Sequence, residues 1–387
     1  MNLKGAIAAV LLAAATTAAP ILASPAVSAQ VKAGDYSQLA PAALAVKAKA
    51  GDAEAQYQLG YNLFHDKVKP DPVQARAWME KAAAQGHGKA AYAAGVMYSN
   101  GDGGDADAAK AVGYYRQAAA AGVGPANAAM GVAYATGTGV ESDMDQMIAW
   151  YRKGAALGDA ASERMLGQAL LYGIGADSDP DQAVAWLRKS AAQNDGDAEA
   201  QLAGLYYDGD AVAVDYNEAY RLAVLAAKHG SADGNYYTGL MQENGRGTKQ
   251  DYDAAFISYG AAYQEAHGGR ALARIGVLLC TGHGVAKNTD SGLKALHAAA
   301  TPATPEAFFA MGELYAQGQC VPQDMARAFV WKRLGILFRD RDVAPWPDEL
   351  KTLSDSMTAA QKASLPDLTR AVGAEIGMEV DANDPKP

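Results

Sequence analysis

The sequence predicts an all-α fold, a right-handed α-solenoid of about eight helix-hairpin repeats of 35–37 residues with terminal caps. Three regularities predict it: a glycine inside an apolar helical pattern, a second glycine signal five or six residues later, and an Asp or Asn 11 or 12 residues after the first glycine. A unit of this length is one helix pair that cannot bury its own apolar face, so neighbouring units must stack. The first glycine recurs at steps of 35, 36, 36, 37, 35, 37 and 36 residues, at Gly60, Gly95, Gly131, Gly167, Gly204, Gly239, Gly276 and Gly312.

The first helix of each repeat carries a core stripe at positions −5, −1 and +3 from this glycine. The three positions are four residues apart, so they fall on one face of a helix. In the third repeat they hold Ala126, Met130 and Tyr134. Position −5 is small in seven of the eight repeats, as a close approach of two helices requires.

The second glycine signal, such as Gly137-Thr138-Gly139, predicts the end of the first helix, because glycine adopts a positive φ without strain. A lone G-x-G also occurs in phosphate-binding loops, but here it recurs without a preceding strand, which favours capping. The acidic or amide residue that follows is suited to accept hydrogen bonds from the free N–H groups of the second helix. These predicted caps are Asp71, Asp107, Asp143, Asp179, Asp215, Asp251, Asn288 and Asp324.

The second helix carries a large residue around position +18 to +20 and then closes with alanines. The large residues are Trp78, Tyr115, Trp150, Trp186, Tyr259 and Trp331. A bulky end and a tight end describe a wedge-shaped hairpin, and stacked wedges form a superhelix. We expect residues 30–50 to hold a linker and a capping half-repeat, 51–335 the eight repeats, 336–380 capping helices around Pro366, and 381–387 a disordered tail.

The N-terminus resembles a secretory signal peptide. Lys4 precedes an apolar stretch and the small residues Val27-Ser28-Ala29, so we place cleavage after Ala29 and assign residues 1–29 to the signal. A retained membrane anchor is the alternative, but the apolar run is short, and no later run of about 18 apolar residues follows. We therefore expect a periplasmic or secreted protein.

The charge balance excludes nucleic acid as the expected partner. The chain has 33 Lys and Arg against 43 Asp and Glu, a net charge of −10, and removing residues 1–29 takes away one Lys, for a net of −11. Binding to phosphates needs a basic stripe, and we identify none at a repeat position.

The two cysteines, Cys280 and Cys320, fall in repeats seven and eight. In an oxidising compartment a disulfide between them is the first hypothesis. The alternative is a buried thiol at Cys280 and an unrelated exposed one at Cys320.

A catalytic set is not evident. The six histidines form no metal-binding pair, and no nucleophile motif occurs at usable spacing. We therefore expect no catalytic residues, no metal and no cofactor, and a protein that is not an enzyme.

A helical wheel places positions −6, −3, −2 and +1 of the first helices away from the core. Tyr and Arg at such positions are typical of binding hot spots. The alternative is that these rings pack sideways between adjacent first helices. The predicted partner-binding residues are Tyr57, Tyr61, Tyr92, Arg164, Gln168, Gln201, Tyr236 and Arg274.

The repeat unit resembles the Sel-one-like repeat family, a relative of the tetratricopeptide repeat. Residues 126–158 show the pattern best, with Gly131, Tyr134, Asp143, Trp150 and Gly158 in register. Repeat one departs from it by lacking the glycine pair, and repeats five to seven lack the tryptophan.

The resemblance implies an exported bacterial scaffold or adaptor whose concave groove binds a partner protein or peptide, in envelope signalling, secretion or host contact. The alternatives are a cell-wall ligand-binding or β-lactam-interacting repeat protein and a structural subunit of a secretion complex. The cysteine pair that β-lactam-linked relatives carry in each repeat is absent here.

Overall fold

The structure is a computed structural model that describes residues 36, 39–266, 268–339 and 348–380. All regular secondary structure in these residues is helical, and nineteen helices are assigned. The chain divides into two compact units, residues 1–195 and 196–387, which are described separately below. The expected signal peptide (1–29) and tail (381–387) lie outside the described residues.

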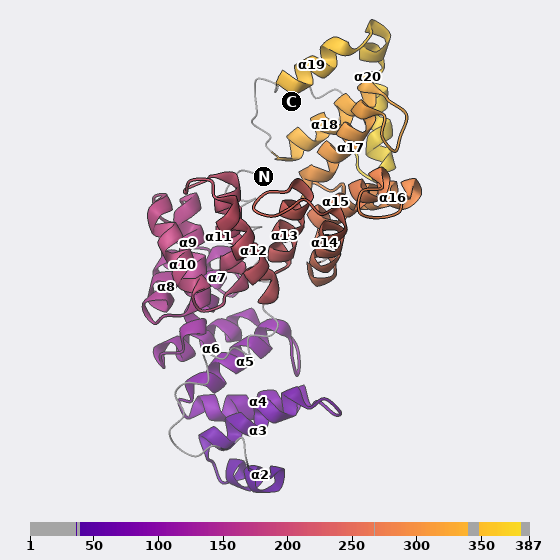
Figure 1. The fold of residues 1–387 in the computed structure, drawn as a ribbon. Helices are drawn as coiled ribbons and strands as arrows, with labels where there is room; N and C mark the ends of the chain where they lie inside the picture. Colours follow the sequence, from indigo (N-terminus) through magenta and orange to yellow (C-terminus); the bar gives the residue numbers. More distant parts are fainter. Residues whose placement is uncertain (1–35, 37–38, 267, 340–347, 381–387) are drawn as a thin grey trace. The chain divides into compact units, whose positions relative to one another are not determined.

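Unit 1 contains an N-terminal helix followed by the first four hairpins, which stack in chain order (Figure 1). Leu44 and Ala48 of the first helix, α2, pack against Ala55 of α3. The helices are α2 (Pro41–Lys49), α3 (Ala53–His65), α4 (Pro72–Ala84), α5 (Gly88–Asn100), α6 (Ala108–Ala120), α7 (Gly124–Thr136), α8 (Met144–Ala156), α9 (Ala160–Tyr172) and α10 (Pro180–Ala191).

Unit 2 contains the other four hairpins and two C-terminal helices. The repeat helices are α11 (Gly196–Asp208), α12 (Tyr216–Lys228), α13 (Ala232–Asn244), α14 (Tyr252–Ala266), α15 (Gly269–Thr281), α16 (Thr289–Ala299), α17 (Pro305–Gln317) and α18 (Met325–Arg339). With unit 1, they confirm the eight hairpins and sixteen repeat helices that the glycine period predicts.

The C-terminal helices are α19 (Asp348–Ser356) and α20 (Ala359–Glu375). Both pack against α18, and Val372 of α20 joins the buried cluster around Trp331. Pro366 lies inside α20 and does not divide it. Helix α19 lies within the segment 336–380, for which capping helices are expected, and residues 340–347 of that segment lie outside the described residues.

All eight predicted caps are confirmed, because each Asp or Asn side chain accepts a hydrogen bond from a backbone N–H two or three residues ahead. In repeat three, for example, Asp143 Oδ1 accepts from the N–H of Gln146 at 3.0 Å. Such a cap contributes about 1 kcal/mol. The recurrent carboxylates are therefore structural.

The loop inside each hairpin fixes the spacing between repeats. Gly137 ends α7 at φ 73° in the left-handed region. Two residues later Gly139 sits so close to the start of α6 that a Cβ would overlap the carbonyl of Ala108. The equivalent glycines of four other repeats approach the preceding second helix in the same way. The loop thus acts as a stop between neighbouring hairpins.

Two residues other than glycine occupy this close-approach position with a positive φ, Ala211 at 63° and Cys320 at 65°. Cys320 forms a disulfide with Cys280, with the two Cα atoms 5.1 Å apart, which confirms the predicted pairing. Its Sγ also lies 3.9 Å from the carbonyl of Thr289, the first residue of α16. A covalent bond therefore joins repeats seven and eight where other repeats use a glycine contact.

First helices of neighbouring repeats contact one another more closely than second helices do. In unit 1 the clearest example is α7 with α9, and in unit 2 α11 with α13 and α15 with α17.

Candidate functional site

The eight residues predicted to bind a partner all lie on first helices, but the structure buries half of them. Tyr92, Arg164, Gln168 and Tyr236 are each at most 9% exposed. Tyr57, Tyr61, Gln201 and Arg274 remain partly exposed.

The burial has two physical causes. The rings of Tyr92 and Tyr236, both at position −3, pack on the second-helix tyrosines of their own hairpins, Tyr115 and Tyr259, with ring centroids 5.9 and 5.8 Å apart. Position −3 is therefore part of the hairpin core wherever both positions hold a tyrosine. This arrangement resembles the sideways packing that the sequence left open, although the ring partner lies on the second helix rather than on an adjacent first helix.

Arg164 is buried for an electrostatic reason. Its Nε donates to Asp195 Oδ2 at 3.1 Å, and the two side chains are only 9% and 14% exposed. Asp159, the N-cap of the same helix, lies close by, and burial raises the pKa of its carboxyl. These groups form a polar cluster at the start of α9 that holds repeat four together.

The accessible part of the face in unit 1 is an aromatic patch on α3, defined by Tyr57, Tyr61, His65 and His87. Tyr61 stacks on His65 with centroids 4.1 Å apart, and Tyr57 stacks on His87 at 4.9 Å. The Nε2 of His87 lies 2.9 Å from Glu54 Oε2, which orients its ring. Burial of its hydroxyl raises the pKa of Tyr57 to about 12. The patch therefore offers aromatic rings beside one carboxylate.

In unit 2 the face carries an arginine patch on α13 and α15, defined by Asp233, Tyr236, Arg270 and Arg274, in which Tyr236 is buried and the other three side chains are accessible. Arg270 donates to Asp233 Oδ1 at 2.6 Å, while its guanidinium carbon lies 4.5 Å from the centre of the Tyr236 ring. The side chain of Arg270 remains 37% exposed. Sequence reasoning missed Arg270, although it precedes Arg274 by four residues and so shares its helix face.

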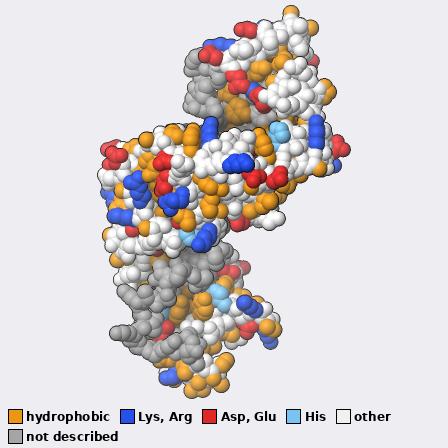
Figure 2. Space-filling view, in the orientation of Figure 1, with side chains coloured by type: hydrophobic (Ala, Val, Ile, Leu, Met, Phe, Trp, Pro, Cys, Tyr) orange, Lys and Arg blue, Asp and Glu red, His pale blue; other side chains and the backbone are white. Residues whose placement is uncertain are grey.

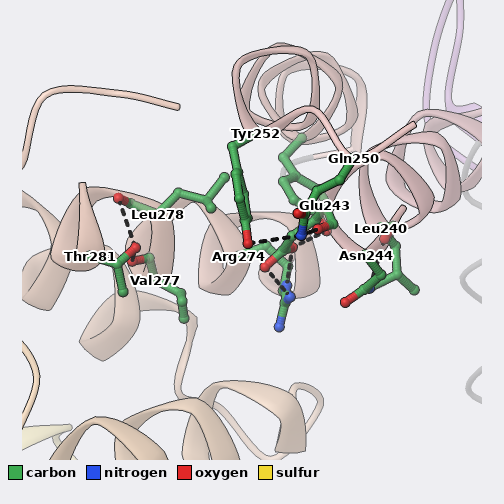
Figure 3. A network of polar contacts seen from close by, with 10 residues as sticks. Leu240, Glu243, Asn244, Gln250, Tyr252, Arg274, Val277, Leu278 and Thr281 are labelled. Carbon is green, nitrogen blue, oxygen red and sulfur yellow. Dashed lines mark hydrogen bonds and ion pairs between the residues drawn. The ribbon is translucent and has the colours of Figure 1, made fainter. Parts of the chain in front are cut away.

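Figure 3 shows how Arg274 is held in place. Its Nε donates to Glu243 Oε2 at 2.9 Å, and its Nη2 pairs with the other oxygen of the same carboxylate. The hydroxyl of Tyr259 donates to Glu243 Oε2 at 2.7 Å. Burial opposes the charge on Arg274, but Glu243 outweighs it and raises the pKa of the guanidinium. A fixed, charged Arg274 on a partly exposed face is suited to bind a carboxylate or a carbonyl.

Gln201 of α11 belongs to the same face of unit 2. Its side-chain oxygen is buried and accepts no hydrogen bond from any residue that the structure describes. The described residues also contain no group of three or more His, Cys, Asp and Glu side chains that could hold a metal ion. The chemistry that the face offers is thus hydrogen bonding, ring contact and charge pairing.

Comparison with known families identifies the repeat. The profile of the Sel1 repeat matches residues 53–87, 88–123, 124–159, 160–195, 196–231, 232–257, 269–300 and 305–331. These eight segments correspond to the eight hairpins of the structure. No curated protein matches the chain.

Several solved structures resemble the chain. A Sel1 repeat protein from Oxalobacter formigenes is 25% identical, with a TM-score of 0.56, over 64% of this chain and 97% of its own. A protective antigen of uropathogenic Escherichia coli with an SLR fold is 23% identical, with a TM-score of 0.38, over 88% of this chain and 95% of its own. An immunity protein from Pseudomonas aeruginosa is 22% identical, with a TM-score of 0.41, over 56% of this chain and 82% of its own.

The helices also bear on membrane insertion. Within the ranges that the structure describes, no helix combines the length and apolar character needed to cross a bilayer.

Proposed function

This chain belongs to the Sel1 repeat family, and we propose that it is an exported, non-enzymatic scaffold whose first-helix face binds a partner protein. Sel1 repeats generally serve as protein–protein interaction scaffolds. The observation that carries the proposal is the arginine patch, where two arginines are held charged and partly exposed on the first-helix face. The signal-like N-terminus and the disulfide support export to a periplasmic or extracellular location.

The contact residues of this proposal follow from accessibility. Tyr57, Tyr61, Gln201 and Arg274, together with Arg270, can reach a partner without unfolding a hairpin. Tyr and Arg are enriched among hot spots because they combine large contact area with hydrogen bonding. The four buried residues of the predicted set would contribute by holding the first helices in place.

Site-specific photocrosslinking tests which face is used. A photoreactive amino acid replaces Tyr61 or Arg270 on first helices, or the exposed Val224 or Ile257 on second helices as matched controls. We expect a defined adduct in the native cell envelope from the first-helix positions and none from the controls. Adducts formed equally from both sets, or from the controls alone, would contradict the proposal.

Truncation then measures the contribution to affinity for the partner identified in the adduct. We expect Tyr61→Ala and Arg270→Ala each to weaken binding by about 1 to 3 kcal/mol, with unchanged helicity. Arg274 is unsuitable for this test, because its removal leaves Glu243 charged and buried. Full affinity in the Tyr61→Ala, Arg270→Ala double variant would exclude this face.

A further inference from the structure

A row of basic side chains crosses the second helices of unit 1. Lys81, Arg116, Arg152 and Arg188 each stand 21 residues after the first glycine of their repeat, and all four are exposed. Lys153 and Lys189 extend the row on α8 and α10. The expectation that no basic stripe occupies a repeat position is therefore wrong. It considered basic residues on the first helices and treated the positions of the second helices only as core and caps. We call these six residues the basic band.

The band is concentrated charge on an acidic chain. The last seven residues of α4, α6 and α8, and the last six of α10, contain six basic residues and one acidic residue, Glu80. The carboxylate of Glu80 already accepts a 2.5 Å hydrogen bond from the hydroxyl of Tyr98. The other acidic side chains of these helices lie in their first turns or at their N-caps, as Asp107, Asp143 and Asp145 do. With their N-caps, the first halves of these helices carry six carboxylates against two basic residues, Arg76 and Lys110, so the second-helix layer is basic along one side and acidic along the other, most clearly at α8 and α10. Figure 2 shows Lys and Arg side chains gathered over α8 and α10.

Aromatic rings fix part of the band. Lys81 Nζ lies 4.1 Å from the centre of the Trp78 ring, Lys153 Nζ lies 4.0 Å from that of Trp150, and Lys189 Nζ lies 3.7 Å from that of Trp186. A cation over an indole face loses some freedom without losing its charge. The lysines are therefore partly ordered before any ligand arrives.

Two arginines of the band carry charge that no described ion pair uses. Arg116 and Arg152 are exposed and make no ion pair with a residue that the structure describes. A favourable interaction with the helix dipole explains a cation in a last turn, but it does not require one at the same position of four consecutive repeats.

We propose that the basic band is a docking surface for an extended acidic segment of a partner protein, on a face separate from the first-helix face. The charge spacing favours a polypeptide. Directly packed helices are about 8–10 Å apart, and successive second helices, which contact one another less than first helices do, lie farther apart. An extended chain rises about 3.3 Å per residue, so three or four residues cover about 10–13 Å, and an acidic residue at every third or fourth position matches one basic residue per helix. The acidic side of the same helices confines the segment to the band.

Other anionic partners fit this surface less well. Duplex nucleic acid carries one negative charge per about 1.7 Å of its axis. One or two basic side chains per helix cannot neutralise charges at that density, and the duplex would also face the acidic side of the helices. A membrane surface needs apolar side chains to insert, whereas the indole rings of the band are half-buried under their lysines.

The test uses the mature full chain and four anionic probes: a labelled peptide with Glu at every third position, poly-L-glutamate, an oligodeoxythymidine of matched charge, and phosphatidylglycerol vesicles. The band variant carries Arg116→Gln, Arg152→Gln, Lys153→Gln and Arg188→Gln. The control variant removes the same charge from exposed lysines of unit 1 outside the band, with Lys47→Gln, Lys49→Gln, Lys67→Gln and Lys69→Gln. Circular dichroism verifies that both variants keep the helicity of the wild type.

We expect the glutamate probes to bind the wild type with an affinity that falls as salt rises. The band variant should lose at least about tenfold in affinity, and the control variant should stay within about twofold of wild type. Equal losses in the two variants would show a net-charge effect and overturn the proposal. Tighter binding of the oligonucleotide or the vesicles, or no binding of glutamate at low salt, would overturn it as well.

Discussion

Two tyrosines at the same repeat position give the sharpest test of the energetics. Tyr151 and Tyr259 both stand 20 residues after the first glycine, and both are fully buried. The hydroxyl of Tyr259 donates to Glu243 at 2.7 Å. The hydroxyl of Tyr151 has no hydrogen-bond partner in the described part of the chain. The difference lies at position +4 of the first helix, which holds Glu243 in repeat six and Ala135 in repeat three.

The change Tyr→Phe removes one oxygen from each site with little loss of packing. At Tyr259 it removes a hydrogen bond to a carboxylate, which contributes about 1.5 to 3 kcal/mol. Because Glu243 keeps both contacts with Arg274, we expect a loss near the lower end, about 1.5 to 2 kcal/mol. At Tyr151 the same change removes a buried hydroxyl that makes no hydrogen bond to a described residue. We therefore expect the free energy of unfolding to rise by about 0 to 1 kcal/mol.

Native-state hydrogen exchange read by mass spectrometry measures both effects locally. Peptides from α13–α14 report on Tyr259→Phe, and peptides from α7–α8 report on Tyr151→Phe. The reasoning is refuted if the two variants lose the same free energy, or if Tyr259→Phe costs less than about 0.5 kcal/mol.

Two further predictions concern the disulfide and pH. The double change Cys280→Ser, Cys320→Ser opens a loop of 40 residues and should lower the free energy of unfolding by about 4 kcal/mol in the chain-entropy model. Urea titration measures this, and a dithiothreitol effect as large in the double variant as in the wild type would contradict it. Burial raises the pKa of Asp159, so its contribution to stability is full below its unfolded pKa and is lost as pH rises through its folded pKa. Asp159→Asn, which keeps the acceptor for Ser162, should therefore match or exceed wild-type stability at neutral pH and lose that advantage toward pH 3. At the exposed cap Asp71, hydrogen bonds from Gln74 lower the pKa of the carboxyl. Asp71→Asn should therefore show the opposite trend, with lower stability than the wild type at neutral pH and equal stability in acid. Melting temperatures that depend on pH in the same way in both variants would contradict these two pKa directions.

The sequence predicts most of the fold because its signals are local. A glycine such as Gly137 ends its helix through its own φ, and a cap such as Asp143 bonds three residues ahead. The disulfide could also be predicted from the sequence, because Cys280 and Cys320 are about one repeat apart. The repeat period does not describe the chain after Gly335, so the bounds of α19 and α20 could not be derived from it.

The candidate site was harder to predict because its geometry depends on contacts between helices. A helical wheel describes one helix alone, so it placed Tyr92 and Tyr236 away from a core that their own second helices provide. The pairing of Arg164 with Asp195 spans 31 residues and has no local pattern. Arg270 and the basic band could be found from the sequence, but only by aligning the repeats and comparing the basic residues at each position of each helix.

The bond at Cys320 has a mechanical consequence. Where only a glycine loop contacts the neighbouring hairpin, a pulling force can separate the two repeats, and they can rejoin. A stack with such contacts unfolds one hairpin at a time under force. Repeats seven and eight instead share a covalent link between Cys280 and Cys320. Under tension applied at the C-terminal end, unravelling that begins after α18 stops at this link, and the load passes to earlier repeats through the chain before Cys280. Helices α16 and α17, which lie between the two cysteines, would then carry no load, so a partner pulling at the C-terminus could extend the chain after Cys320 without pulling these two helices apart.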